Sequence, residues 1–134
     1  RKGGVIMRVK FKYLESILMG ILELNDCKMS FQLKLELRDI QEKLRKEATW
    51  FMGQRMELIS KYSKKDEKGQ PLTDGDSYIL NNPAGFQNEY NDLLETEFEI
   101  EPIPAELVSK FELSGKAWDG LFHILERGEN VNEG

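Results

Sequence analysis

The sequence is poor in the residues that most often carry enzyme and metal chemistry. Cys27 is the only cysteine and His123 the only histidine among 134 residues. A single thiol cannot form a disulfide within the chain, and it cannot supply the several thiolates of a structural zinc site. A lone histidine without a serine, cysteine or carboxylate in triad spacing does not point to acid–base or nucleophilic catalysis. We therefore expect no catalytic residues, no metal site and a reducing cytoplasm.

Features of three other functional classes are also absent. Positive charge is not in excess, because 24 Asp and Glu outnumber 19 Lys and Arg and give a net charge of −5, whereas nucleic-acid-binding proteins are usually basic. The sequence contains no glycine-rich phosphate-binding loop. Charges such as Glu15 and Glu23 interrupt the apolar runs well short of the ~20 residues that span a bilayer. We therefore expect no bound cofactor, no membrane contact and no nucleic-acid partner.

The first residues raise the question of where the protein's own sequence begins. Lys2-Gly3-Gly4 can be encoded as AAA-GGA-GGN, which contains a bacterial ribosome-binding signal, and Met7 follows closely. We expect residues 1–6 to be a translated leader, which would assign the gene to a bacterium or its phage. The remaining length fits a single domain at 7–128, with a flexible tail at 129–134.

Hydrophobic periodicity predicts a strand and two helices in the first half of the chain. Residues 8–12 alternate between polar and apolar side chains, which is typical of a half-buried strand. Apolar residues then repeat at helical spacing over 14–22. Ser30 is the expected N-cap of a much longer helix from about Phe31 to Tyr62. These two helices would form an N-terminal helical hairpin with one long arm.

The second half is predicted to contain a hairpin, two further helices and another strand. A turn-rich segment after the long helix includes a candidate strand at 77–80. Asn82 followed by Pro83 is a helix start signal. Residues 96–101 alternate as a strand, and a last helix runs from near Ser114 to Gly128, burying Trp118, Leu121, Phe122 and Leu125.

The two predicted strands carry complementary charge. Opposite charges that face each other across a strand pair stabilise the pairing, so we expect the two strands to form a small antiparallel sheet. This pairing also explains why glutamates recur at every second position of the later strand, so no metal ion is needed to account for them. The predicted fold class is α+β, mostly α. The charged rows are Arg8, Lys10 and Lys12 on one strand and Glu97, Glu99 and Glu101 on the other.

The long helix has more apolar residues than one buried side requires. A second apolar stripe predicts that its C-terminal half is buried on two sides, and Gly53 predicts a close helix crossing there. Two alternatives explain the stripe: a core shared with the last helix, or self-association, because monomers rarely expose large apolar patches. The residues expected on this interaction surface are Trp50, Phe51, Met52, Met56 and Ile59.

The polar side of the long helix suggests a second kind of site. Ion pairs are expected between Glu42 and Lys46 and between Asp39 and Lys43, and such mixed charge usually marks a solvated helix face. If the protein instead binds a small molecule or nucleotide between helices or subunits, arginines of this helix would contact its phosphate. These candidate anion contacts are Arg38, Arg45 and Arg55.

The stretch KYSKKDEKGQPLTDGDSYILNNPAGFQNEYNDLLETEFEI resembles a family of small uncharacterised proteins of phages and prophages of Gram-positive bacteria. The similar features are the turn-rich segment at 66–71, a helix led by Phe86, the short acidic strand and the ending at 112–115. The resemblance extends over nearly all of residues 7–126. It implies a phage source and a bacterial cytoplasm, and it carries no catalytic residue or activity.

These observations predict a non-enzymatic phage or prophage protein that acts by protein–protein interaction. Its partner would be a second copy of itself or a phage or host protein, in particle assembly or in inhibition of a host system. Mimicry of DNA by the acidic strand is one form of such inhibition. The alternative is the small-molecule or nucleotide binder described above, and a small enzyme ranks third.

Overall fold

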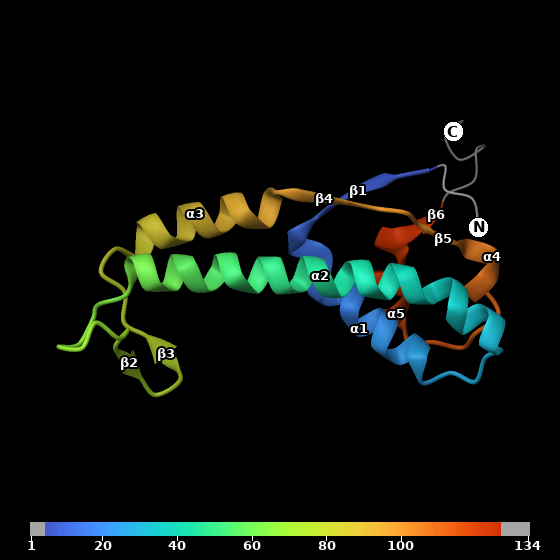
Figure 1. Cartoon of the computed structure of the whole chain (residues 1–134), viewed down its shortest axis with the longest axis horizontal. Coiled ribbons are helices and arrows are strands. Elements are labelled where there is room, and N and C mark those ends of the chain that lie inside the picture. Colours follow the sequence, from blue (N-terminus) through green and yellow to red (C-terminus); the bar gives the residue numbers. More distant parts are fainter. Residues whose placement is uncertain (1–4, 127–134) are drawn as a thin grey trace.

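The computed structural model describes residues 5–126, and one long helix forms the axis along which the other elements lie (Figure 1). The predicted α+β, mostly helical fold class is confirmed, although three helices rather than two follow the long one in the described chain. The elements in chain order are β1 (Met7–Lys10), the 3-10 turn η1 (Phe11–Tyr13), α1 (Leu14–Asn25), α2 (Phe31–Tyr62), β2 (Thr73–Asp74), β3 (Ser77–Tyr78), α3 (Pro83–Glu95), β4 (Glu97–Ile100), β5 (Ile103–Pro104), α4 (Ala105–Val108), α5 (Gly115–Leu121), the 3-10 turn η2 (Phe122–Ile124) and β6 (Leu125–Glu126).

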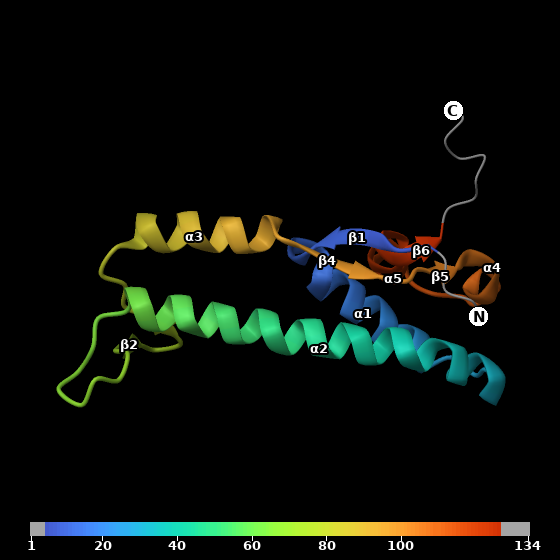
Figure 2. The ribbon, with the colours of Figure 1, turned by 45° about the horizontal axis from the view of Figure 1, so that its top comes forward.

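The helix α2 begins and ends as the sequence predicts. Ser30 Oγ accepts a hydrogen bond from the Leu33 amide at 3.1 Å, which satisfies one of the free N–H groups of the first turn. At 1.5 Å per residue its 32 residues extend for about 48 Å. The N-terminal half of α2 lies beside α1, and its C-terminal half lies beside α3 (Figure 2). The helix thus connects two parts of the molecule.

The predicted strand pairing is confirmed, since β1 and β4 pair antiparallel with Arg8 opposite Glu99 and Lys10 opposite Glu97. Arg8 Nε donates to Glu97 at 3.1 Å. The strand β1 is shorter than predicted. It ends at Lys10 because the next residue, Phe11, turns into the core, and this places Lys12 in η1.

The last helix packs against α1, and its predicted position beside the long helix is wrong. Gly20 of α1 and Gly120 of α5 allow the backbones to approach closely: a Cβ on Gly120 would lie 2.0 Å from the Ser16 carbonyl oxygen. The helix α5 also ends at Leu121, because the chain then forms η2 and β6, which pairs parallel with β5. The predicted end at Gly128 lies outside the described residues, and Phe122, expected to be buried, is exposed.

The C-terminal half of α2 pairs with α3, and the two helices are joined by the β2–β3 hairpin. Asn82 caps α3 as predicted, with its Oδ1 accepting from the Gly85 amide at 3.0 Å and Pro83 at the first helical position. Lys61 and Tyr62 both donate to the Glu89 carboxylate. The C-terminal half of α2, the hairpin and α3 form what we call the arm. These polar contacts and the packed rings of Tyr62, Phe86 and Tyr90 hold it together.

The prediction that this half of α2 is buried on two sides is wrong. Trp50, Met52 and Met56 are 46%, 49% and 44% exposed, because α3 and the core cover only one side of the helix. Gly53 does not mark a helix crossing, since no atom lies within 4 Å of a Cβ built there. Only Ile59, beside the hairpin, is buried as expected.

Candidate functional site

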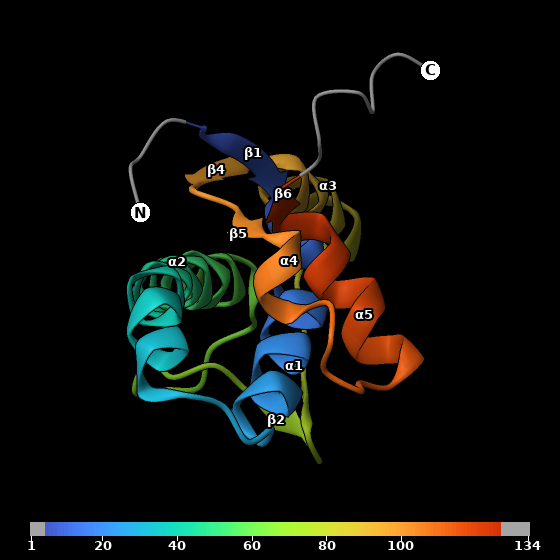
Figure 3. The same cartoon turned by 90° about the vertical axis from the view of Figure 1, so that its right-hand side faces the viewer.

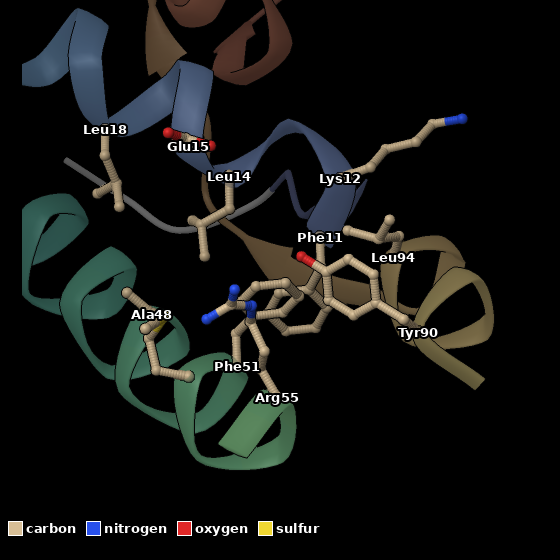
Figure 4. Close-up of a pocket in the computed structure, with 11 residues that line it drawn as sticks. Phe11, Lys12, Leu14, Glu15, Leu18, Ala48, Phe51, Arg55, Tyr90 and Leu94 are labelled. Carbon is tan, nitrogen blue, oxygen red and sulfur yellow. The ribbon is translucent and has the colours of Figure 1, made fainter. Parts of the chain in front are cut away.

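A cleft of about 470 Å³ opens where the start of α1, the middle of α2 and the end of α3 meet (Figure 4). Three segments that are distant in sequence therefore contribute to it. Most of its lining is apolar or aromatic, with charged side chains at a few points. The lining residues are Phe11, Lys12, Leu14, Glu15, Leu18, Ala48, Phe51, Met52, Arg55, Tyr90 and Leu94.

Aromatic rings form the floor of the cleft. Phe51 of α2 stacks on Phe11 with ring centroids 5.5 Å apart and an interplanar angle of 17°, and it contacts Tyr90 of α3 at 6.3 Å. The series continues along the arm, because Tyr90 stacks on Phe86 at 5.7 Å and Phe86 meets Tyr62 edge-on at 6.3 Å. The floor is thus the end of a continuous row of rings.

The side of α2 that faces the cleft follows from helical spacing. Four residues of α2 line the cleft, and each lies three or four positions from two of the others, so they share one side of the helix. They are Ala48, Phe51, Met52 and Arg55. Leu18 belongs to the opposite wall, formed by α1, and faces Ala48 (Figure 4). The cleft is therefore a groove between two helices, and α3 closes one of its ends.

Arg55 is the distinctive charged group of this cleft. It is half-buried and makes no ion pair with any residue of the described chain. Lys12 is neutralised instead, because its Nζ lies 3.0 Å from Glu95 Oε2. Figure 4 shows the Arg55 guanidinium and the Tyr90 hydroxyl both directed into the cleft. An unpaired guanidinium beside aromatic rings is suited to bind a carboxylate or phosphate that carries an apolar group.

The structure separates the five residues predicted as an interaction surface. Phe51 and Met52 line the cleft, whereas Ile59 is buried and Met56 is exposed one turn beyond Met52. Trp50 lies on the other side of α2, where its ring packs 5.3 Å from that of Phe11 beside β4. Residues two positions apart on a helix point about 200° apart, so Trp50 and Met52 cannot belong to one stripe.

The three candidate anion contacts are also divided. Arg38 and Arg45 line a shallow hollow beside the end of α1, and Glu42 lies in the same hollow and offsets their charge. Arg55 is in the cleft. Neither predicted ion pair, Glu42 with Lys46 or Asp39 with Lys43, is formed within residues 5–126. Lys43 instead lies 2.7 Å from Glu47, and Asp39 pairs with Arg38. The structure therefore offers no single cluster of three arginines.

The carboxyl groups of Glu95 and Glu23 have a lowered pKa because each accepts hydrogen bonds from neighbouring side chains or backbone. Hydrogen bonds from Lys10 and Lys12 lower the pKa of Glu95. The pKa of Glu23 is lowered because its carboxylate accepts the Ser114 amide at 2.7 Å and the Ser114 hydroxyl at 2.8 Å. His123 stacks on Tyr13 with ring centroids 4.1 Å apart. These contacts orient the groups within the fold, and the two lysines also neutralise Glu95.

Two structural features are absent from the described part of the chain. Within residues 5–126, no group of three or more His, Cys, Asp or Glu side chains is arranged to hold a metal ion. None of the helices in the same part of the chain combines the length and apolar composition of a membrane span.

Sequence reasoning found part of the cleft and missed the rest. Phe51, Met52 and Arg55 were predicted as functional residues, but for two different sites. Phe11 was expected only as part of the half-buried strand at 8–12, and Tyr90 was given no role in a site. Their meeting depends on α3 folding back along α2. Comparison of the chain with known protein families, curated proteins and solved structures gives no match.

Proposed function

We propose that this protein acts without catalysis by binding a partner protein, and that the cleft receives an apolar side chain of that partner next to a carboxylate. The observation that carries the proposal is the unpaired Arg55 at an aromatic-floored groove. Arginine and aromatic residues in a partly enclosed pocket are typical anchors of protein interfaces. A carboxylate beside the inserted side chain would pair with the guanidinium.

The residues around the mouth of the cleft support a protein partner. Met52 lines it and is half-exposed, and Met56 continues the exposed side of α2. On α1, Met19 and Leu22 are exposed next to Leu18, which lines the cleft. Methionine side chains are flexible and polarisable, so they adapt to a partner's surface. An apolar rim that wide extends beyond what a small ligand would cover.

The setting of this proposal comes from the resemblance to phage proteins, which stays a prediction. In that setting the partner is a phage or host protein of the bacterial cytoplasm, and binding serves particle assembly or inhibition of a host system. The acidic face of β4 is a weaker candidate for contact, because Arg8 already pairs with Glu97 and Glu99.

A small-molecule or nucleotide ligand is the second candidate, and the aromatic floor favours it. A nucleobase could stack on Phe11 and Phe51 while Arg55 binds a phosphate. The cleft, however, provides only one unpaired cation within the described chain, since Lys12 is held by Glu95. A di- or triphosphate would therefore lack most of the positive charge that such ligands require.

The two candidates can be separated by selection from a random peptide library displayed on a carrier. We expect the chain to select peptides with an aromatic or large aliphatic residue next to Asp or Glu, and Arg55→Glu to lose these peptides. The matched control is Lys46→Glu, which makes the same charge change at an exposed position of α2 outside the cleft. It should bind like the wild type.

Thermal unfolding with a panel of nucleotides tests the alternative. A ligand at a hundred times its dissociation constant stabilises a protein by roughly 2.7 kcal/mol, which is easily seen as a shift in Tm. A shift with a nucleotide that Arg55→Glu abolishes would replace the proposed function with ligand binding. Peptides selected equally well by Arg55→Glu would also contradict it.

A further inference from the structure

The outer side of α2 carries a second regular pattern, which its buried side does not explain. Eight residues follow one another at alternating steps of four and three, and all eight are exposed. This spacing averages 3.5 residues, which is the repeat of the seam positions a and d in a coiled coil. The eight residues of this seam are Phe31, Leu35, Arg38, Glu42, Arg45, Thr49, Met52 and Met56.

The seam residues are exposed, although Arg38, Glu42 and Arg45 border the hollow beside the end of α1, and Met52 borders the cleft. Figure 3, which looks along α2, shows strands above it, helices to its right and the segment with β2 below it, and leaves its left side open. Buried residues of α2 such as Leu37 and Leu44 belong to the covered side. Gly53, beside the seam, has no atom within 4 Å of a Cβ built on it. A second helix could therefore lie along the whole outer side.

The seam is apolar at both ends and polar at its centre. Phe31 and Leu35 at the N-terminal end are 86% and 51% exposed, values that are high for large apolar side chains. Met52 and Met56 at the other end are half-exposed. Four polar or charged residues lie between the two apolar ends. A second copy of the helix that runs in the opposite direction would therefore place apolar ends against apolar ends and the polar centre against the polar centre.

We propose that a second copy of this chain binds along the seam in the antiparallel direction, forming a symmetric two-helix coiled coil. In antiparallel pairs each a position lies opposite a d position of the partner helix. Among the registers that this rule allows, the one that matches apolar with apolar ends places Phe31 opposite Met56 of the second copy and Leu35 opposite Met52. Because a two-fold axis relates the copies, each contact occurs twice, and all four apolar residues of each chain are covered.

The charges at the centre agree with the same register. It places Glu42 of one copy opposite Arg45 of the other, which pairs opposite charges. Within the described chain neither residue forms an ion pair, although Arg38 pairs with Asp39 and Lys43 with Glu47. A parallel arrangement would instead place Glu42 opposite Glu42 and Arg45 opposite Arg45. Like charges at the centre of a coiled coil select against that orientation.

This interface goes beyond the proposed function and overlaps the cleft only on the α2 side of its mouth. Phe31 and Leu35 lie outside the cleft, and Arg55 lies outside the seam. The two surfaces share Met52, which lines the cleft, and Met56, one turn beyond it. Variants at the first two residues therefore test the coiled coil, and variants at Arg55 test partner binding.

The first experiment is the mass of the full chain in solution, by light scattering after size exclusion over a range of concentrations. We expect twice the 15.6 kDa of one chain. The double variant Phe31→Asp with Leu35→Glu should reduce the mass to one chain and keep the wild-type circular dichroism. Leu22→Glu, which changes an exposed leucine of α1 outside the seam, is the control and should remain dimeric. A single-chain mass for the wild type, or a dimer unaffected by the double variant, would overturn the proposal.

A charge exchange tests the direction and register. Glu42→Arg and Arg45→Glu each place like charges opposite one another, and each should raise the dimer dissociation constant roughly tenfold. The variant carrying both substitutions restores opposite charges only in the antiparallel register, so its dissociation constant should return close to the wild-type value. Additive weakening in the combined variant would overturn the antiparallel arrangement.

Discussion

Tyr62 and Glu89 are joined by a hydrogen bond from the phenol hydroxyl to the carboxylate, and Lys61 donates to the same carboxylate oxygen at 2.7 Å. One carboxylate thus connects the last turn of α2 to the middle of α3. The hydrogen bonds from Lys61 and then from Tyr62 lower the pKa of Glu89, and the bond to Glu89 raises the pKa of Tyr62. This contact links the two helices of the arm.

The first prediction is a loss of stability in acid. Because the pKa of Glu89 is lowered in the folded state, its contribution is complete above the pKa of an unfolded glutamate and is lost as the pH falls through the folded pKa. The free energy of unfolding should therefore decrease as the pH falls below about 5. Urea unfolding at a series of pH values measures this dependence.

Glu89→Gln should make that acid dependence shallower, because the substituted amide does not titrate. Glu57→Gln is the control, since Glu57 is an exposed glutamate of α2 without an ion pair in the described chain. If the two variants and the wild type share one pH profile, the contact does not contribute to stability in solution.

The second prediction concerns two glycines with opposite surroundings. Gly120→Ala would bring a Cβ to 2.0 Å from the Ser16 carbonyl oxygen, so α1 and α5 must move apart. We expect a loss of about 3 kcal/mol, at the upper end of overpacking costs. Gly53→Ala meets no atom within 4 Å and should stabilise the helix by about 0.5–1 kcal/mol. Thermal and urea unfolding compare both, and equal effects would contradict the α1–α5 packing.

The third prediction separates the buried and exposed sides of α2. Leu44 is fully buried, so Leu44→Ala should cost about 2–5 kcal/mol through the lost contacts and the cavity. Met56→Lys replaces an exposed residue and should change the unfolding free energy of the monomer by no more than about 0.5 kcal/mol. Unfolding at low protein concentration measures both. A Met56→Lys chain that fails to fold would show that this side is part of the core.

The fourth prediction concerns the start of α5. Ser114 Oγ accepts from the Ala117 amide at 3.1 Å and donates to Glu23 of α1 at 2.8 Å. Ser114→Ala should therefore cost about 1 kcal/mol, the usual value for a lost helix cap. Ser109→Ala is a suitable control, because Ser109 lies outside any helix N-cap. A loss equal to that of the control would argue against the cap.

Local signals predicted the starts of the helices well, because a helix start depends on a few adjacent residues. Ser30 and Asn82 cap their helices as expected, since capping needs only a short polar side chain three residues before a free N–H. The β1–β4 pairing was also predictable, because its charges recur every second residue. These features need no knowledge of which helix lies beside which.

Side-by-side packing was not predictable from the same patterns. Gly20 and Gly120 are 100 positions apart, and only the folded chain shows that each makes room for the other helix. Trp50 and Met52 were read as one apolar stripe because a sequence pattern does not show which side of α2 is covered by α3 and β4. The cleft was missed for the same reason, since Phe11 meets Phe51 only when η1 packs on α2, and Tyr90 joins them only after α3 folds back.

The row of aromatic rings has a consequence for how the molecule opens. In the described chain the main buried cluster includes no residue between Leu44 and Phe98. The arm therefore depends on ring stacking, a few polar contacts and the buried side chains of Ile59 and Leu93. Elements with little buried apolar area open first in native-state hydrogen exchange. Amide protons of α3 and of the last turns of α2 should therefore exchange well before those around Leu44, so that one continuous helix would show two distinct rates of exchange.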